Sequence, residues 1–355
     1  MRKRVILTGG GTAGHVTPHL ALIPRLKADG WDIHYIGTAD GIERKLIAQI
    51  PGVEYHTVPS GKLRRYFDIK NLTDPFKVIS GVGKAFALVG KIKPGIVFSK
   101  GGFVSVPVVY GAWMRRVPVV LHESDITPGL ANRITAPFAK AVCATFPEAA
   151  KAIGPKGVYT GTPLRETLFE GSRKRGLALA GFNGTKPVLL MMGGSTGAAS
   201  VNAALRESLP GLLPKFDILH IAGKGNMDAS LNRTDGYRQF EYMDARLPDA
   251  LAAADIMLSR AGANTLSEIL ALRIPSLLVP YPLSASRGDQ VLNARSFEER
   301  GFAMVLEQER MTAKTLVMAI ESLYDRREAI ASKMRGEPVS NGIAGVIEQI
   351  EKYAL

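Results

Sequence analysis

The sequence predicts an α/β protein with two doubly wound domains, because one local pattern occurs twice, about half the chain apart. Residues Val5–Val16 read VILTGGGTAGHV, and residues Val188–Ala199 read VLLMMGGSTGAA. Each is a short apolar run, typical of a buried parallel strand, followed by a glycine-rich turn with a hydroxyl group and the start of a helix. Such a helix start presents backbone N–H groups and a partial positive charge, to which anions bind. We therefore expect two domains that face a cleft, each holding part of a ligand.

Further strand candidates alternate with helical stretches in both halves. They are residues 5–8, 33–36, 96–99, 117–122 and 140–144, and then 188–192, 218–222, 256–259 and 276–280. This order predicts a mainly parallel sheet in each half. The polar, glycine-rich segment 162–186 predicts the linker.

Composition supports two ordinary cores. The chain has 355 residues, of which 46% are hydrophobic. No apolar run reaches the roughly 18 residues needed to span a bilayer, and the start MRKR runs directly into a strand, so we expect a soluble protein without a signal peptide. The single cysteine, Cys143, cannot form an internal disulfide, which points to a reducing compartment; we interpret it as a buried apolar side chain.

The net positive charge of the chain lies entirely in the first half. Residues 1–165 hold 23 Lys and Arg against 10 Asp and Glu, whereas residues 166–355 hold 22 of each. This asymmetry implies an anionic partner for the first domain: a nucleic acid, an acidic lipid surface or a phosphorylated substrate. No basic stripe with stacking aromatic residues occurs, so we expect no nucleic-acid partner.

Between residues 62 and 100 an apolar stripe runs beside lysines. Four apolar residues follow helical spacing and three lysines recur every seven residues: Ile79, Val82, Phe86 and Val89, and Lys77, Lys84 and Lys91. In one interpretation this helix packs on its own sheet with solvated lysines outside. In the other it lies on an anionic membrane surface.

The first turn resembles a dinucleotide-binding motif but differs from it. Gly9, Gly11 and Gly14 match G-x-G-x-x-G, yet the acidic residue expected after the second strand is missing, and only Asp40 lies beyond it. His15 follows the turn directly. An imidazole beside an anion-binding turn can act as a general base, or it can simply cap or pack locally.

A third constellation lies in residues 259–282, where a strand and a glycine turn lead to a helix that Asn264 or Thr265 can cap. Glu268 in its first turns can accept the two hydroxyls of a ribose, or it can merely favour the helix N-terminus. Further polar residues suited to bonding a polyol follow downstream, at Asp289, Gln290 and Asn293.

Eight motifs occur in the order and spacing of one family: GGGTAGHVTP, KGGFVSVP, VVLHESD, TGTPLR, GGSTGAASVN, EYMDA, SRAGANTLSE and GDQVLNA. Over nearly its whole length the chain resembles the MurG family of bacterial peptidoglycan enzymes. The resemblance implies the GT-B fold, in which two Rossmann-like domains face a cleft. It implies an acceptor and membrane-docking domain over residues 1–164, a UDP-sugar domain over 165–340, and a helix over 341–355 that returns to the first domain.

The family's activity implies the substrates. Its members move N-acetylglucosamine from UDP-N-acetylglucosamine to the muramyl 4-hydroxyl of an undecaprenyl-diphosphate-linked muramyl pentapeptide, as peripheral proteins at the cytoplasmic face of the cell membrane. The chain has no Asp-x-Asp motif, so we expect an inverting displacement without metal or cofactor. The alternatives are a GT-B enzyme with another lipid acceptor, a nucleotide-sugar epimerase, and a non-catalytic membrane-docking or nucleotide-binding subunit.

The resemblance also implies residue roles. His15 would be the catalytic base. The substrate-binding residues would be Thr12, Ala13 and Gly14 toward the donor sugar, Arg165 and Ser195 at the diphosphate, Met243 at the uracil, Ala263, Asn264, Thr265, Leu266 and Ser267 along the diphosphate and ribose, Glu268 at the ribose, and Gln290 at the N-acetylglucosamine. Two positions depart from the common pattern: Ala13 stands where glycine is frequent, and Asp125 where many relatives have asparagine. A diphosphate would repel Asp125 unless this carboxylate is protonated or turned toward a cation.

Overall fold

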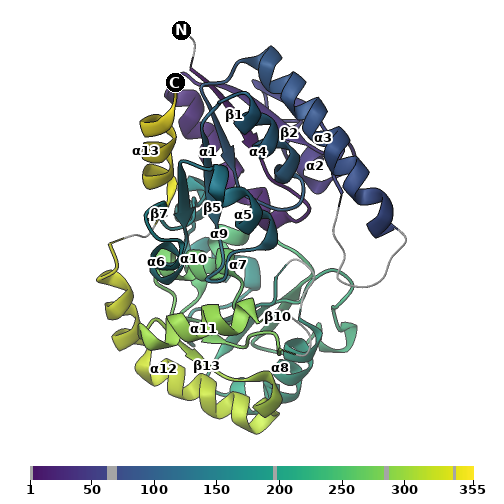
Figure 1. The fold of residues 1–355 in the computed structure, drawn as a ribbon. Coiled ribbons are helices and arrows are strands. Elements are labelled where there is room, and N and C mark those ends of the chain that lie inside the picture. Colours follow the sequence, from purple (N-terminus) through teal and green to yellow (C-terminus); the bar gives the residue numbers. More distant parts are fainter. Residues whose placement is uncertain (1–2, 62–69, 195–197, 284–287, 339–340) are drawn as a thin grey trace. The chain divides into compact units, whose positions relative to one another are not determined.

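The computed structural model describes residues 3–61, 70–194, 198–283, 288–338 and 341–355. The chain forms two compact units (Figure 1): unit 1 comprises Met1–Arg165 and Asn341–Leu355, and unit 2 comprises Glu166–Ser340. Within the described ranges, no helix combines the length and apolar character needed to cross a membrane.

Unit 1 is built on a seven-stranded parallel sheet with the strand order β3-β2-β1-β4-β5-β6-β7. The strands are β1 (Arg4–Thr8), β2 (Asp32–Gly37), β3 (Val53–Thr57), β4 (Ile96–Ser99), β5 (Val119–Glu123), β6 (Ala141–Ala144) and β7 (Gly157–Tyr159). The helices are η1 (Ala13–His15), α1 (Thr17–Ala28), α2 (Ile42–Ile47), α3 (Lys70–Ile92), α4 (Ser105–Met114), α5 (Leu130–Thr135), η2 (Ala136–Phe138), α6 (Pro147–Ile153) and α13 (Ile343–Tyr353).

Each face of this sheet carries its own core, because successive strand residues point to opposite sides. Val5 and Leu7 of β1 belong to a cluster that α1 and α13 cover. Ile6 belongs to a second cluster, which α3 and α4 cover. The last helix of the chain therefore completes the core of the unit in which the chain begins.

Unit 2 is built on a six-stranded parallel sheet with the order β10-β9-β8-β11-β12-β13. The strands are β8 (Val188–Met192), β9 (Asp217–Ile221), β10 (Tyr237–Phe240), β11 (Ile256–Ser259), β12 (Ser276–Leu278) and β13 (Ala303–Val305). The helices are η3 (Glu166–Glu170), α7 (Arg173–Ala180), α8 (Ala199–Leu212), η4 (Ala229–Leu231), α9 (Leu247–Ala253), α10 (Ala263–Leu272), α11 (Asp289–Glu299), η5 (Gln308–Arg310) and α12 (Ala313–Arg335).

Two doubly wound parallel sheets confirm the expected fold class. All nine strand candidates form strands, whereas β3, β7, β10 and β13 were not predicted. These four are the edge strands of the two sheets.

The apolar stripe of α3 divides between core and surface. Val89 lies in the core with 1% of its side chain exposed, together with Ala85. Ile79 is 69% exposed. Phe86 is half-buried, and the guanidinium of Arg115 lies 3.7 Å from its ring centroid. The C-terminal half of the helix thus packs on its own sheet, whereas Ile79 faces solvent.

Candidate active site

Two of the sequence motifs meet at the glycine turn that follows β1. Gly11 has φ +84°, and a Cβ there would lie 2.5 Å from the Phe103 ring. Gly102 has φ +78°, and a Cβ there would lie 2.4 Å from the carbonyl oxygen of Gly10. Only glycine allows such a close approach of two backbones. The segment that contains Gly102 and Phe103 therefore lies directly against the first turn.

His15 closes the short helix η1 rather than opening α1, which begins at Thr17. Its Nδ1 atom lies 2.9 Å from the Thr12 hydroxyl, at hydrogen-bond distance. A Cβ on Gly102 would come within 3.5 Å of the same nitrogen. When Nδ1 donates to this hydroxyl, the lone pair is on Nε2, so Thr12 can set the tautomer and orientation of a general base.

A buried carboxylate that no sequence motif indicated supports this turn. Glu43 has no exposed surface. It accepts hydrogen bonds from the Gly11 N–H at 3.3 Å and from the N–H of Thr38 at 3.0 Å, together with one from the Thr38 hydroxyl. A Cβ on Gly10 would lie 2.6 Å from the carboxylate. The Gly11 N–H is therefore used inside the protein, and the negative charge of Glu43 lies under a turn that we expected to bind an anion.

Lys100 provides a buried positive charge behind the same turn. Its side chain is 1% exposed, and the ammonium group donates to the Ser124 hydroxyl. Burial lowers the pKa of Lys100 to about 8, while the carboxylates of Glu123 and Asp125 oppose this shift. The expected contact of Asp125 with the donor stays a prediction.

Glu123 organises the segment that contains Asp125. Burial raises the pKa of Glu123, and its hydrogen bonds oppose that shift. It accepts hydrogen bonds from the Asn132 side chain at 2.8 Å and from the backbone N–H groups of Ser124 at 2.8 Å, Asp125 at 3.1 Å and Gly129 at 3.0 Å.

Tyr35, which contacts the neutral side chain of His19, holds the start of the turn. The Tyr35 hydroxyl donates to the Gly9 carbonyl oxygen at 2.6 Å and lies 3.2 Å from His19 Nδ1. Burial, and then the charges of Lys100 and His15, lower the pKa of His19 to about 3. His19 is therefore uncharged at neutral pH and has a structural role.

In unit 2, β8 leads to Gly194, which has φ +91°. Ser195 lies outside the described residues, so its expected contact with the diphosphate stays a prediction. The helix that the second glycine-turn pattern predicts is α8, which is 14 residues long.

Arg260, whose role was not predicted either, connects the segments around this turn. Its guanidinium is buried and lies 4.1 Å from the Tyr281 ring centroid. It donates to the carbonyl oxygens of Val279 at 3.0 Å and Pro280 at 3.2 Å, to the Ser200 hydroxyl at 3.0 Å and to Gln308 Oε1 at 2.7 Å. This arginine therefore ties the first turn of α8 to the loop after β12.

The expected cap of α10 is wrong. The helix begins at Ala263, and its N-cap is Gly262 rather than Asn264 or Thr265. Glycine has no side chain that could bond the first N–H groups, so the helix start is not occupied by its own cap. Glu268 consequently lies in the second turn of α10, where it is partly exposed.

The start of α11 is held by the loop after β12 and by the segment between β11 and α10. Gln290 Oε1 accepts the Tyr281 N–H at 3.2 Å. Asn293 is fully buried and donates to the Ala261 carbonyl oxygen at 3.3 Å. The expectation that Asn293 bonds a sugar is therefore wrong, because its side chain faces the interior. Among the other predicted residues, Met243 is buried in the segment that connects β10 to α9. Arg165 is exposed at the end of the first segment of unit 1.

Comparison with known proteins assigns the chain to a family. The profile of the glycosyltransferase family 28 N-terminal domain matches residues 5–144, and that of the glycosyltransferase family 28 C-terminal domain matches residues 188–350. The chain belongs to glycosyltransferase family 28. Both glycine turns fall inside the matched segments, so this family accounts for the repeated pattern.

Individual proteins are similar to the chain over its full length. A Geobacillus thermodenitrificans protein named UDP-N-acetylglucosamine--N-acetylmuramyl-(pentapeptide) pyrophosphoryl-undecaprenol N-acetylglucosamine transferase is 55% identical over 355 residues, covering 100% of both chains. A protein of the same name from Clostridium tetani is 52% identical over 354 residues, 99% of each chain. The crystal structure of Acinetobacter baumannii MurG has a TM-score of 0.79 at 26% identity and covers 99% of each chain. The resemblance to the MurG family is confirmed.

Proposed function

We infer that the chain is an N-acetylglucosaminyltransferase that uses UDP-N-acetylglucosamine as donor and an undecaprenyl-diphosphate-linked muramyl pentapeptide as acceptor. The observation that carries this inference is 55% identity over the whole length to a relative named for that reaction. The reaction belongs to peptidoglycan synthesis, and through it the chain would serve cell shape and division.

His15 is the proposed base, which removes the proton of the muramyl 4-hydroxyl as the sugar transfers. Its support is the Thr12 hydroxyl at 2.9 Å from Nδ1, since an oriented imidazole is a more effective base than a rotating one. Attack on the face opposite the departing diphosphate inverts the anomeric carbon, so an α-linked donor gives a β-linked product.

The donor is assigned to unit 2. Breaking the bond to UDP places negative charge on the diphosphate, and the N-termini of α8 and α10 offer N–H groups that can stabilise it. Arg260 fixes the first turn of α8 through Ser200. Glu268 would accept the ribose hydroxyls, and Gln290, whose carbonyl oxygen is held by the Tyr281 N–H, would face the N-acetylglucosamine.

The acceptor is assigned to unit 1, together with peripheral docking at the cytoplasmic face of the membrane. The lipid tail of the acceptor stays in the bilayer, so the enzyme must bind at the surface. Support comes from the excess of basic residues in the first half and from exposed apolar side chains: Ile79 is 69% exposed, Trp113 51% and Met114 53%. Aromatic and aliphatic side chains beside lysines are typical of reversible binding to an anionic leaflet.

The deciding experiment supplies radiolabelled UDP-N-acetylglucosamine and a polyprenyl-diphosphate muramyl pentapeptide, with other sugar nucleotides as competitors. We expect label in the lipid product and competition only by the cognate donor. Transfer to diacylglycerol instead would favour a different lipid acceptor. Conversion of UDP-N-acetylglucosamine without any acceptor would identify an epimerase.

A further inference from the structure

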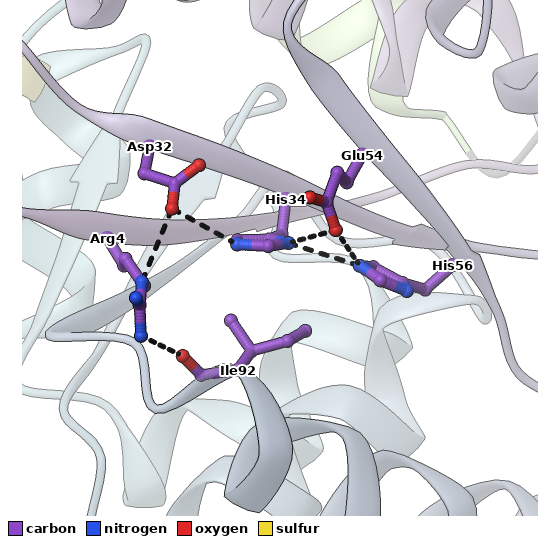
Figure 2. Close-up of polar contacts among 6 residues, drawn as sticks. All are labelled: Arg4, Asp32, His34, Glu54, His56 and Ile92. Carbon is purple, nitrogen blue, oxygen red and sulfur yellow. Dashed lines mark hydrogen bonds and ion pairs between the residues drawn. The ribbon is translucent and has the colours of Figure 1, made fainter.

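A group of metal-ligating side chains lies on β2 and β3, outside the residues assigned to the reaction. The parallel register pairs His34 with Glu54 and Ile36 with His56. Because side chains alternate along a strand, Glu54 and His56 point to the same side of the sheet, and His34 shares that side. Figure 2 shows the three side chains converging. Within the described part of the chain, no other group of three such ligand side chains has its atoms within 4.8 Å of one another.

The spacing of the three ligand atoms matches a tetrahedral metal site. His34 Nδ1 lies 3.1 Å from His56 Nε2 and 3.4 Å from Glu54 Oε2, and the last two atoms are 3.7 Å apart. Zinc bonds of about 2.0–2.1 Å at tetrahedral angles require ligand atoms about 3.3 Å apart. The three distances scatter around that value, so a metal ion can bind all three ligands with small side-chain adjustments.

The type of ligand selects the type of metal. Two imidazole nitrogens and one carboxylate oxygen suit zinc and related transition metals, whereas magnesium and calcium prefer oxygen ligands alone. The His34 side chain is 8% exposed, that of His56 23% and that of Glu54 70%. One side of the site is thus open to water. We propose that His34, Glu54 and His56 bind one Zn²⁺ ion, with water as the fourth ligand.

A second carboxylate lies behind the most buried ligand. Asp32 Oδ2 lies 3.7 Å from Nε2 of His34, on the ring edge opposite the site (Figure 2). Arg4 holds this carboxylate, with its Nε 3.3 Å from Oδ2, and donates from Nη1 to the Ile92 carbonyl oxygen at 2.9 Å. A carboxylate behind a metal-binding histidine favours a proton on the far nitrogen and leaves the near lone pair for the metal.

The site would act on the sheet rather than on the reaction. β3 is the edge strand, and β2 separates it from β1 and its glycine turn. A metal ion shared by His34 on one strand and two ligands on the next would hold this edge strand in place. Bound zinc should therefore raise the thermal stability of the protein, because it binds the folded chain more tightly than the unfolded chain.

The test measures zinc binding to the full chain after treatment with a chelator. Isothermal titration should give one Zn²⁺ per chain and no comparable binding of Mg²⁺, and bound Co²⁺ should show the visible absorption of a tetrahedral site. Two variants on the edge strand each remove one ligand: His56→Gln at a partly exposed position and Glu54→Gln at an exposed one. We expect each to weaken Zn²⁺ binding by about 100-fold or more and to abolish the zinc-dependent rise in melting temperature. Asp32→Asn, which acts through His34, should cost about 10–100-fold.

His15→Gln is the matched control, since it removes a partly exposed histidine outside the cluster. It should bind zinc as the unaltered protein does. Circular dichroism confirms that each variant is folded. The proposal is overturned if the unaltered chain binds no zinc, if both ligand variants bind it unchanged, or if His15→Gln alone abolishes binding.

Discussion

The side chain of Asn341 forms both hydrogen bonds that a neighbouring strand would form with Leu164. Its Oδ1 accepts the Leu164 N–H at 3.1 Å, and its Nδ2 donates to the Leu164 carbonyl oxygen at 3.1 Å. The same Oδ1 accepts the Ile343 N–H at 3.1 Å. Leu164 is one residue before the chain leaves unit 1, and Asn341 is where it re-enters. One carboxamide thus holds the two crossing points together.

Replacing Asn341 with alanine should destabilise unit 1. Three hydrogen bonds are lost, each worth about 0.5–1.5 kcal/mol, so we expect the free energy of unfolding to fall by about 2 kcal/mol. Asn341→Asp keeps the two acceptor contacts and should lose less. Denaturant titrations measure both variants, and equal stability of Asn341→Ala and the unaltered chain would refute the role.

His15→Ala should lower kcat by a factor of about 100 or more, the usual scale for a lost general base, while donor affinity changes little. Thr12→Val removes the hydroxyl that faces Nδ1 and should lower kcat less, whereas Thr12→Ser should restore it. Steady-state kinetics with both substrates measure these effects. Near-normal turnover of a folded His15→Ala variant would exclude the base assignment.

Glu268→Ala should weaken UDP binding and change acceptor binding little. A hydrogen bond to a charged group is worth about 1.5–3 kcal/mol, which corresponds to about 10–150-fold in Kd. Glu268→Gln retains an acceptor oxygen, so its Kd for UDP should lie between those of the unaltered chain and Glu268→Ala. Isothermal titration with UDP tests this, and an unchanged Kd for the alanine variant would show that Glu268 does not hold the ribose.

Acid should destabilise unit 2 through His220. Burial, and then the charge of Arg206, lower its pKa from 6.5 to about 3. Between these two values the unfolded chain binds a proton that the folded chain does not. The free energy of unfolding therefore falls as pH drops below about 6.5, by up to about 1.4 kcal/mol per pH unit for this one group.

The matching measurement compares urea unfolding of the unaltered chain and of His220→Gln at about pH 7 and about pH 5. The variant should be less stable at neutral pH, because the Tyr237 and Asn202 contacts change, but its stability should fall less on acidification. The same pH dependence in both proteins would mean that His220 is not kept neutral by the fold.

Charge reversal on α3 should weaken binding to anionic vesicles. Lys77, Lys84 and Lys91 are exposed. Each basic residue near an anionic surface contributes about 1 kcal/mol to binding, so the affinity of the triple Lys→Glu variant for anionic vesicles should fall by about 100-fold or more. The variant should also dissociate from the vesicles at a lower salt concentration than the unaltered chain does. UDP binding should stay intact.

Triple Lys→Glu replacement at Lys174, Lys314 and Lys333 of unit 2 is the control, because it makes the same change in net charge at exposed positions. Sedimentation across a salt series measures both variants. If both variants lose vesicle binding equally, the loss follows from total charge and not from α3. If the α3 variant binds vesicles unchanged, the docking surface lies elsewhere.

The central strands were predictable, and the edge strands were not. A central strand such as β8 is buried on both faces and reads VLLMM, a continuous apolar run. The edge strand β3 reads VEYHT. Only Val53 of this strand is buried, and the remaining residues are partly or fully exposed, so polar residues are tolerated there. Neither a continuous run nor a clean alternation marks such a segment. The same exposure placed Glu54 and His56 where they can bind a metal.

The candidate site shows the same division. The glycine turns and the position of His15 follow from local sequence, so motifs reveal them. Glu43, Lys100 and Arg260 act on segments far away in the chain: Arg260 bonds Ser200 and Gln308. The sequence does contain one signal for these three residues, because each is a charged residue beside a glycine turn or an apolar strand. The partners of each residue, however, depend on tertiary packing. Capping at Gly262 rather than Asn264 likewise depends on where β11 delivers the chain.

The packing of α13 in unit 1 has a consequence for biosynthesis. The core against α1 includes Val346, Ile347 and Ile350, and the Leu355 N–H donates to the Gly95 carbonyl oxygen at 3.1 Å. A ribosome adds about 5–20 residues per second from the N-terminus, and domains generally fold as they emerge. Unit 2 has all its residues at Ser340, but unit 1 lacks part of its core until the final turns leave the exit tunnel. The first unit to be synthesised is therefore the last that can finish folding.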